Sequence, residues 1–155
     1  MKKQLFLSLL GLLLCFSCKK DEPVGSDYIV FGHFYGECAG EGCVEIFKVQ
    51  DGKLFEDSND IYPDSKHPYI GNYHELSDTK YRLVKDLRRD VPAALLNETA
   101  HVIGTPDAGD WGGLYIEINS GSDTRYWLID KMESNLPAYL VGFKKKVEDA
   151  IDLVK

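Results

Sequence analysis

Short apolar runs along the chain are separated by segments rich in Gly, Pro and Asp, a pattern typical of strands joined by turns. Residues 28–35 are mostly β-branched or aromatic at odd and even positions alike, which predicts a central strand buried on both faces. Residues 44–49 predict a second strand, and Asp51-Gly52 predicts a tight hairpin turn into a third strand at residues 54–55. A long polar connection with two prolines follows.

A helix is predicted after this connection. Ser77 or Asp78 is suited to cap its N-terminus, and Leu83 and Leu87 are spaced to lie on one face before the helix ends near Arg89.

The clearest helix begins at Pro137, near the end of the chain. Its apolar residues recur at steps of three and four, at Leu136, Leu140, Phe143, Val147, Ile151 and Val154. We expect the three lysines 144–146 on the opposite, solvated side.

Residues 99–103, 114–118 and 125–129 predict further strands, the last two as a hairpin, so the order strand, strand, strand, helix occurs twice. One ungapped shift aligns Val30, Gly32, Gly40, Glu45, Ile46 and Asp51 with Val102, Gly104, Gly112, Glu117, Ile118 and Asp123. This suggests an internal β-β-β-α duplication with residues 58–76 inserted in the first copy. The alternative is two unrelated hairpins with similar turns. Either way, we expect an α+β fold with an antiparallel sheet and helices on one face.

The N-terminus has the pattern of an export signal. A short basic start at residues 1–4 precedes an apolar run over residues 5–16. The run is too short to span a bilayer core, which needs about 20 helical residues, and it has the layout of a secretory signal peptide.

Cys18 follows this run directly, with the small residue Ser17 before it. The arrangement resembles the lipobox of bacterial lipoproteins, in which the cysteine thiol receives a diacylglycerol and the new N-terminus is acylated after cleavage. The charged residues 19–22 also resemble the surface-export signal of Bacteroidota lipoproteins. The resemblance implies lipidation at Cys18 and anchoring in the outer membrane, facing the cell surface or the periplasm. Cys15 is a rival acceptor, and an ordinary signal peptide or an uncleaved anchor is the alternative.

This interpretation divides the chain into a signal peptide (residues 1–17), a lipidated cysteine with a flexible tether (residues 18–26) and a single globular domain (residues 27–155). The 155 residues carry a formal net charge of −7 without a compact basic patch, which disfavours a nucleic-acid partner. No cofactor is indicated.

Cys38 and Cys43 enclose four residues in a predicted turn between strands. In an envelope compartment this spacing favours a disulfide that closes the turn. Free thiols are one alternative. A metal site is the other, with His33 as a third ligand, although a structural zinc requires four ligands.

The corresponding turn of the second half, residues 105–113, is the candidate binding segment. It resembles a Gly-rich Cys-Pro-Asp-Cys turn of small Bacteroidota lipoproteins, with Thr105 and Ala108 in place of the cysteines. Asp107 and Asp110 could offer oxygens to Ca²⁺ and Trp111 could stack on a sugar, but the spacing of a calcium loop is absent. The same residues also serve turns for conformational reasons alone.

The remaining polar residues carry no recognisable catalytic spacing. An acidic run, Glu56, Asp57, Asp60 and Asp64, is expected to be solvated, and His67 and His74 have no evident partner. Tyr62, Tyr69 and Tyr73 either contact a protein or carbohydrate or cover the sheet. We therefore expect a lipid-anchored binding module rather than an enzyme. The alternative is a small envelope hydrolase or enzyme inhibitor with its site on the 105–113 turn.

Overall fold

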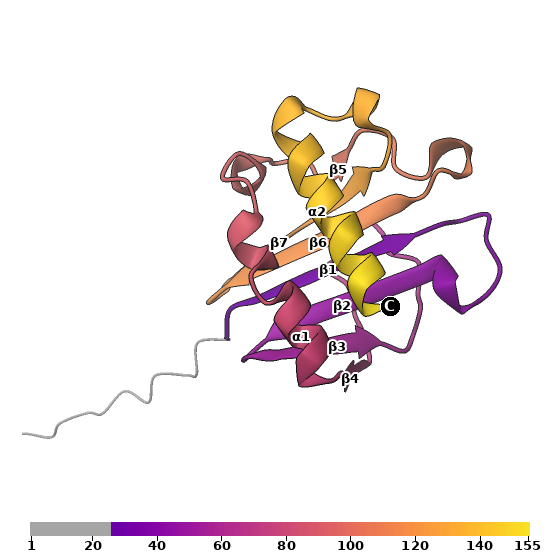
Figure 1. Ribbon diagram of the computed structural model, residues 1–155. Helices are drawn as coiled ribbons and strands as arrows, with labels where there is room; N and C mark the ends of the chain where they lie inside the picture. The colour runs from indigo at the N-terminus through magenta and orange to yellow at the C-terminus, as the bar shows by residue number, and fades with distance from the viewer. Residues whose placement is uncertain (1–25) are drawn as a thin grey trace, which may run out of the picture.

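A seven-stranded sheet forms the middle of the protein, and two α-helices cross one of its faces (Figure 1). The computed structural model describes residues 26–155, so Cys18 and the signal segment lie outside the described residues. The strands are β1 (Tyr28–Phe34), β2 (Val44–Gln50), β3 (Lys53–Asp57), β4 (Tyr73–Glu75), β5 (Val102–Ile103), β6 (Gly113–Ser120) and β7 (Asp123–Asp130). The helices are α1 (Asp78–Val84) and α2 (Ala138–Val154). The expected α+β class, with helices on one face of the sheet, is confirmed.

The strand order is β4-β3-β2-β1-β6-β7-β5, with β1 at the centre as its apolar character predicts. All neighbouring strands are antiparallel except β5 and β7, which are parallel. The β2–β3 hairpin turns at Asp51 and Gly52, both with positive φ, the conformation that a two-residue hairpin turn requires.

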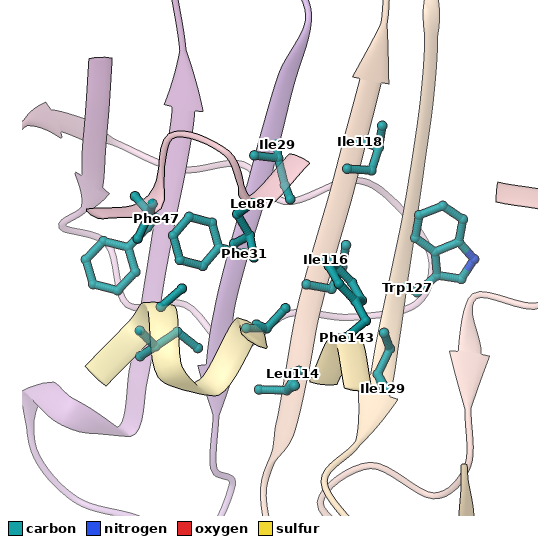
Figure 2. Packing of buried hydrophobic residues seen from close by; sticks show 14 of the residues in the cluster. Ile29, Phe31, Phe47, Leu87, Leu114, Ile116, Ile118, Trp127, Ile129 and Phe143 are labelled. Carbon is teal, nitrogen blue, oxygen red and sulfur yellow. The ribbon is translucent and has the colours of Figure 1, made fainter. Parts of the chain in front are cut away.

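The face of the sheet below the helices holds an aliphatic and aromatic core (Figure 2). The strands contribute Phe31, Phe47, Ile116 and Trp127, and α2 contributes Leu140, Phe143, Val147 and Ile151. All are buried, in agreement with the periodicity of the sequence. This packing fixes α2 over the sheet and brings its C-terminal end close to the end of β1.

The opposite face is covered by the insertion, residues 58–76. Val30, Phe34, Ile46, Tyr115 and Leu128 form a second buried cluster there, and Tyr69 and Tyr73 pack against it. Tyr69 and Tyr73 therefore cover the sheet, which is one of the two roles that the sequence allowed for the tyrosines of the insertion. Both faces are buried, which explains why β1 is apolar throughout.

A buried carboxylate anchors the insertion on this face. Glu117, 3% exposed, accepts hydrogen bonds from the Tyr28 hydroxyl (2.7 Å) and the Tyr115 hydroxyl (2.5 Å). It also accepts one from the backbone N–H of Tyr69 (3.1 Å). Burial and this carboxylate raise the pKa of Tyr28 to about 12, so its hydroxyl remains a donor at neutral pH.

Two details of the helices differ from the expectation. Leu83 is exposed, and Val84 and Leu87 face the core instead, because α1 ends at Val84 and a 3₁₀ turn follows. Lys144 is buried, not on the solvated side. It lies at the edge of the apolar face of α2, where its ammonium contacts Glu148 (2.9 Å) and Glu133 (3.6 Å).

The fold agrees only in part with the internal duplication suggested by the sequence. The element order β-β-β-α occurs in both halves once β4, which lies in the insertion, is left out, but the pairing does not repeat. In the first half β1 pairs antiparallel with β2, whereas its counterpart β5 pairs parallel with β7 and not with β6. The strand expected over residues 99–103 is reduced to Val102–Ile103, at the sheet edge.

Candidate functional site

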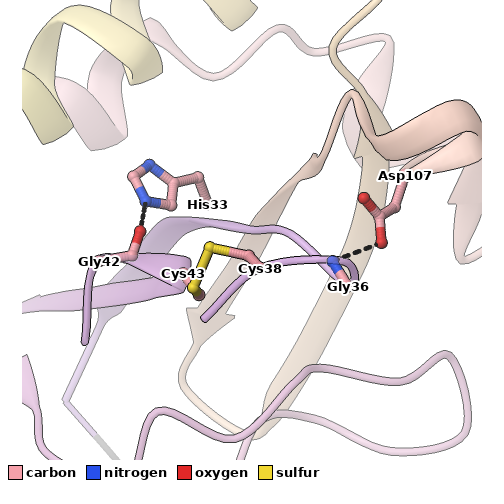
Figure 3. The surroundings of a disulfide bond; sticks show 6 residues. All are labelled: His33, Gly36, Cys38, Gly42, Cys43 and Asp107. Atoms are coloured by element: carbon pink, nitrogen blue, oxygen red, sulfur yellow. Dashed lines mark hydrogen bonds between the residues drawn. A yellow bond between two sulfur atoms is a disulfide. The ribbon is translucent and has the colours of Figure 1, made fainter. Parts of the chain in front are cut away.

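Two turns meet at the end of the sheet where β1 stops and β6 starts. The first turn, after β1, is closed by a disulfide between Cys38 and Cys43, with Cα atoms 5.6 Å apart (Figure 3). The cysteine pair is thus placed as the sequence predicts. The backbone N–H of Tyr35 donates to the Cys43 carbonyl (2.9 Å), so the turn continues the β1–β2 ladder.

Asp107 joins this turn to the second one. Its Oδ2 accepts from the Gly36 N–H (2.7 Å, Figure 3) and from the Tyr62 hydroxyl (2.9 Å). Its Oδ1 accepts from the Gly112 N–H (3.0 Å), which closes its own turn. A Cβ at residue 36 would lie 2.5 Å from Asp107 Oδ2, so any larger residue there would displace this carboxylate. The hydrogen bonds give Asp107 a positioning role, and they occupy oxygens that a ligand would need.

Trp111 and Asp110 face outward from the second turn. The Trp111 side chain is 64% exposed, in contrast to the fully buried Trp127. Both residues line a cleft of about 450 Å³ together with Tyr35, Lys131, Met132 and Glu148. Gly112 permits this arrangement: its φ is +73°, and a Cβ would lie 2.4 Å from the Tyr35 ring.

The cleft continues inward along the C-terminal part of α2. The inner part, about 360 Å³, shares Tyr35, Lys131 and Glu148 with the outer part and adds His33, Asp152 and Lys155. We call the two parts together the helix-end cleft. Its combined size falls in the range of small-molecule sites.

Lys131 and Tyr35 form the junction between the two parts. The Lys131 ammonium donates to the Tyr35 hydroxyl and lies 4.6 Å from the centroid of its ring. Its nearest carboxylate oxygen, on Glu148, is 4.0 Å away, whereas Lys144 contacts the other oxygen of Glu148 at 2.9 Å. Glu148 is therefore mainly engaged by Lys144.

His33 lies at the inner end and is 9% exposed. Its Nε2 is 3.1 Å from the Gly42 carbonyl oxygen, which can only accept, so Nε2 carries the proton (Figure 3). Burial lowers the pKa of His33. The hydrogen bond to Gly42 acts in the opposite direction, the cations Lys131 and Lys155 lower the pKa by smaller amounts, and burial decides the net direction. The neutral ring then offers Nδ1 as an acceptor.

The insertion has a pocket of its own. Ile61, Tyr62, Pro63, His67, Tyr69 and Ile70 line a space of about 380 Å³, mostly apolar. Tyr62 lines this pocket, and its hydroxyl donates to Asp107 of the second turn. Burial and this hydrogen bond raise the pKa of Tyr62 to about 12. The pocket and the helix-end cleft have no lining residue in common.

The acidic run is divided by the fold. Asp57 is buried, contrary to expectation, because it accepts hydrogen bonds from the Asp60 N–H (3.1 Å), the Tyr69 hydroxyl (2.7 Å) and the Asn72 N–H. The two histidines do have partners. His67 lies 3.3 Å from Asp64, and His74 lies 3.1 Å from the Ser58 hydroxyl.

Within residues 26–155, no group of three His, Cys, Asp or Glu side chains is arranged to hold a metal ion. No helix in this part of the chain is long and apolar enough to cross a membrane. No protein-family model matches the chain, and no curated protein matches its sequence.

Sequence reasoning identified Asp110 and Trp111 but missed Tyr35, Lys131 and Glu148 as partners in the same cleft. Lys131 lies two residues after the strand predicted at residues 125–129 and Tyr35 ends another predicted strand, so each lies where loops carry function. That signal exists in the sequence, but it does not say that the two strand ends adjoin.

Proposed function

We propose that the protein is a lipid-anchored protein of the cell envelope, tethered through Cys18, whose domain binds a ring-containing ligand in the helix-end cleft. The observation that carries the binding role is the exposed Trp111 side chain beside a cleft lined by polar groups. An indole face stacks on planar or saccharide rings, while carboxylates and amines at the same place fix hydroxyl groups.

The structural disulfide supports the proposed compartment. Cys38 and Cys43 lie at bonding distance in a solvent-accessible turn, and such bonds persist in oxidising compartments. Several acyl chains on Cys18 would hold the domain firmly at a lipid surface, since each buried CH₂ contributes about 0.8 kcal/mol.

The anchor is tested by fractionation of cells expressing Cys18→Ala or Cys15→Ala. We expect Cys18→Ala to leave the membrane fraction and Cys15→Ala to remain in it, because only Cys18 is the proposed lipid acceptor. Retention of Cys18→Ala in the membrane fraction together with an acyl group on Cys15 would show that Cys15, and not Cys18, is the lipid acceptor. Retention with no acyl group at all would refute lipid anchoring.

The binding role is tested with the full chain in detergent against a glycan panel. We expect Trp111→Ala to lower the affinity for every ligand found by at least about tenfold, equivalent to about 1.4 kcal/mol. Ile70→Ala is the matched control, because Ile70 is also a well-exposed apolar residue (74%) but lines the separate pocket of the insertion. If Ile70→Ala removes binding and Trp111→Ala does not, the site lies in the insertion.

A small hydrolase is the second candidate, favoured by one observation. His33 is neutral, has an unprotonated Nδ1 and lines the inner cleft, which suits a general base. The residues lining the cleft include no serine, threonine or cysteine, so the nucleophile would be water. Hydrolysis of a bound saccharide that is lost in His33→Gln would favour this function over binding alone.

A further inference from the structure

The two ends of the helix-end cleft differ in chemistry. The outer end presents the Trp111 ring and the Asp110 carboxylate, the junction presents the Lys131 ammonium and the Tyr35 phenol, and the inner end presents the His33 imidazole. A ligand that spans the cleft therefore meets a stacking surface first and charged hydrogen-bond donors second.

Lys131 has donor capacity to spare. An ammonium has three N–H donors, and one of them is directed to the Tyr35 hydroxyl oxygen. The Lys131 side chain is only 20% exposed, and the carboxylate nearest to it is 4.0 Å away and held by Lys144. Its charge is thus partly shielded from water, and its one counter-ion, Glu148, is shared with Lys144 and more distant from Lys131, which favours an incoming anion.

Tyr35 adds a second donor at the same place. Its hydroxyl oxygen accepts from Lys131, so its own proton is free to donate. The ring is fixed from two sides: its edge meets His33 at 5.2 Å between centroids, and it lies against Gly112. Two adjacent donors, one charged and one neutral, match the two oxygens of a carboxylate.

The acidic residues of the cleft limit the charge that it accepts. Asp152 and Asp149 are paired with Lys155 (2.6 Å) and Lys145 (2.8 Å), while Asp110 has no cationic partner among the described residues. A dianionic phosphate would meet repulsion from these carboxylates, whereas a single carboxylate at Lys131 avoids most of it. Carboxylate oxygens and the Nδ1 of His33 in turn accept hydrogen bonds from hydroxyl groups.

We propose that the ligand is an acidic saccharide, with a sugar ring on Trp111 and the carboxylate of a hexuronic acid residue on Lys131 and Tyr35. This inference rests on the proposed binding function and specifies its ligand class. Hydroxyl groups of the sugar donate to Asp110, Glu148 and His33.

The test compares one saccharide with and without its charge. Calorimetric titration of the full chain in detergent uses oligogalacturonate and its fully methyl-esterified form, which has the same rings and no carboxylates. We expect the wild type to prefer the acid form by at least about tenfold. Lys131→Met should abolish that preference while it retains binding of the ester, and Tyr35→Phe should reduce the preference.

Lys146→Met is the matched control, since it removes an equal charge from α2, the helix that borders the cleft. Lys146 contacts Asp90, and neither residue lines the cleft. The Lys146→Met variant should therefore prefer the acid form as strongly as the wild type does. Melting temperatures of all variants verify folding, and Lys131→Arg should restore part of the preference.

Equal affinity of the wild type for both saccharides, or a preference that survives Lys131→Met, overturns the carboxylate assignment and leaves the binding function standing. Absence of binding to either saccharide also overturns it. The binding function is then decided separately by the response of other glycans to Trp111→Ala.

Discussion

The two faces of the sheet are buried by different kinds of chain. On one face, α1 and α2 pack aliphatic and aromatic side chains against the strands. On the other, the insertion, a polar segment with one three-residue strand, packs Tyr69 and Tyr73 there and is held by hydrogen bonds to Glu117 and Asp57. A sheet face can thus be covered without helical periodicity, provided that the backbone groups of the covering segment find buried acceptors.

The difference has an energetic consequence. On the sheet face covered by the helices, packing is the sum of many dispersion and hydrophobic contacts. It is lost when side-chain volume is removed from the core. On the face covered by the insertion, the packing depends on a few polar groups. It is lost when a single acceptor that serves several hydrogen-bond donors is removed. The following predictions test whether the two faces respond in these two ways.

Phe143→Ala should have the largest effect. Phe143 is buried between α2 and the sheet, so its truncation removes apolar contacts and leaves a cavity. We expect a loss of about 3–5 kcal/mol in the free energy of unfolding, measured by urea denaturation. Leu153→Ala, an exposed position on the same helix, should change it by less than about 0.5 kcal/mol. Similar losses in both variants would show that α2 is not packed as described.

Glu117→Leu should destabilise the protein by about 2–3 kcal/mol, because the hydroxyls of Tyr28 and Tyr115 lose their acceptor and the Tyr69 N–H keeps only the Tyr115 hydroxyl oxygen (2.8 Å). The insertion should then be cleaved by protease under native conditions faster than the rest of the chain. Glu37→Leu, in an exposed turn, is the control. Uniform protease sensitivity along the Glu117→Leu chain would argue against a separately anchored segment.

Replacement of Cys38 and Cys43 by serine should cost about 2 kcal/mol on the chain-entropy model, since the closed loop is short. This turn joins β1 to β2 and belongs to neither face alone. The loss should equal that caused by a reductant acting on the wild type, and the reductant should not affect the double variant. A reductant effect that persists in the double variant would point to another cause.

His33→Gln should have the smallest effect, visible only in the pH dependence of stability. The pKa of His33 is lowered in the folded protein, so the unfolded chain binds a proton at higher pH than the native one. Wild-type stability should therefore fall as the pH drops below about 6.5 and level off below the folded pKa. Denaturation between pH 7.5 and 5 should show a shallower slope in His33→Gln. Identical slopes would mean that His33 titrates normally.

The candidate site was only partly predictable from the sequence. Trp111 was identifiable because a large aromatic in a Gly-rich turn has little to pack against locally. Asp107 had the same local appearance, but its carboxylate is used by Gly36 and Tyr62, which lie 71 and 45 residues away in the chain. Local sequence does not distinguish an aspartate that binds a ligand from one that joins two turns.

By itself, the sequence determined what depends on near neighbours: the central apolar strand β1, the Asp51-Gly52 hairpin, the apolar face of α2 and the closeness of Cys38 to Cys43. These follow from side-chain periodicity and from turn conformation, which act over a few residues. Only the tertiary structure decided that β1 pairs with β6, and hence that Lys131 meets Tyr35 across a separation of 96 residues. Strand order arises from the packing of whole faces, so the chemistry gathered at a sheet end is a property of the fold and not of any one segment.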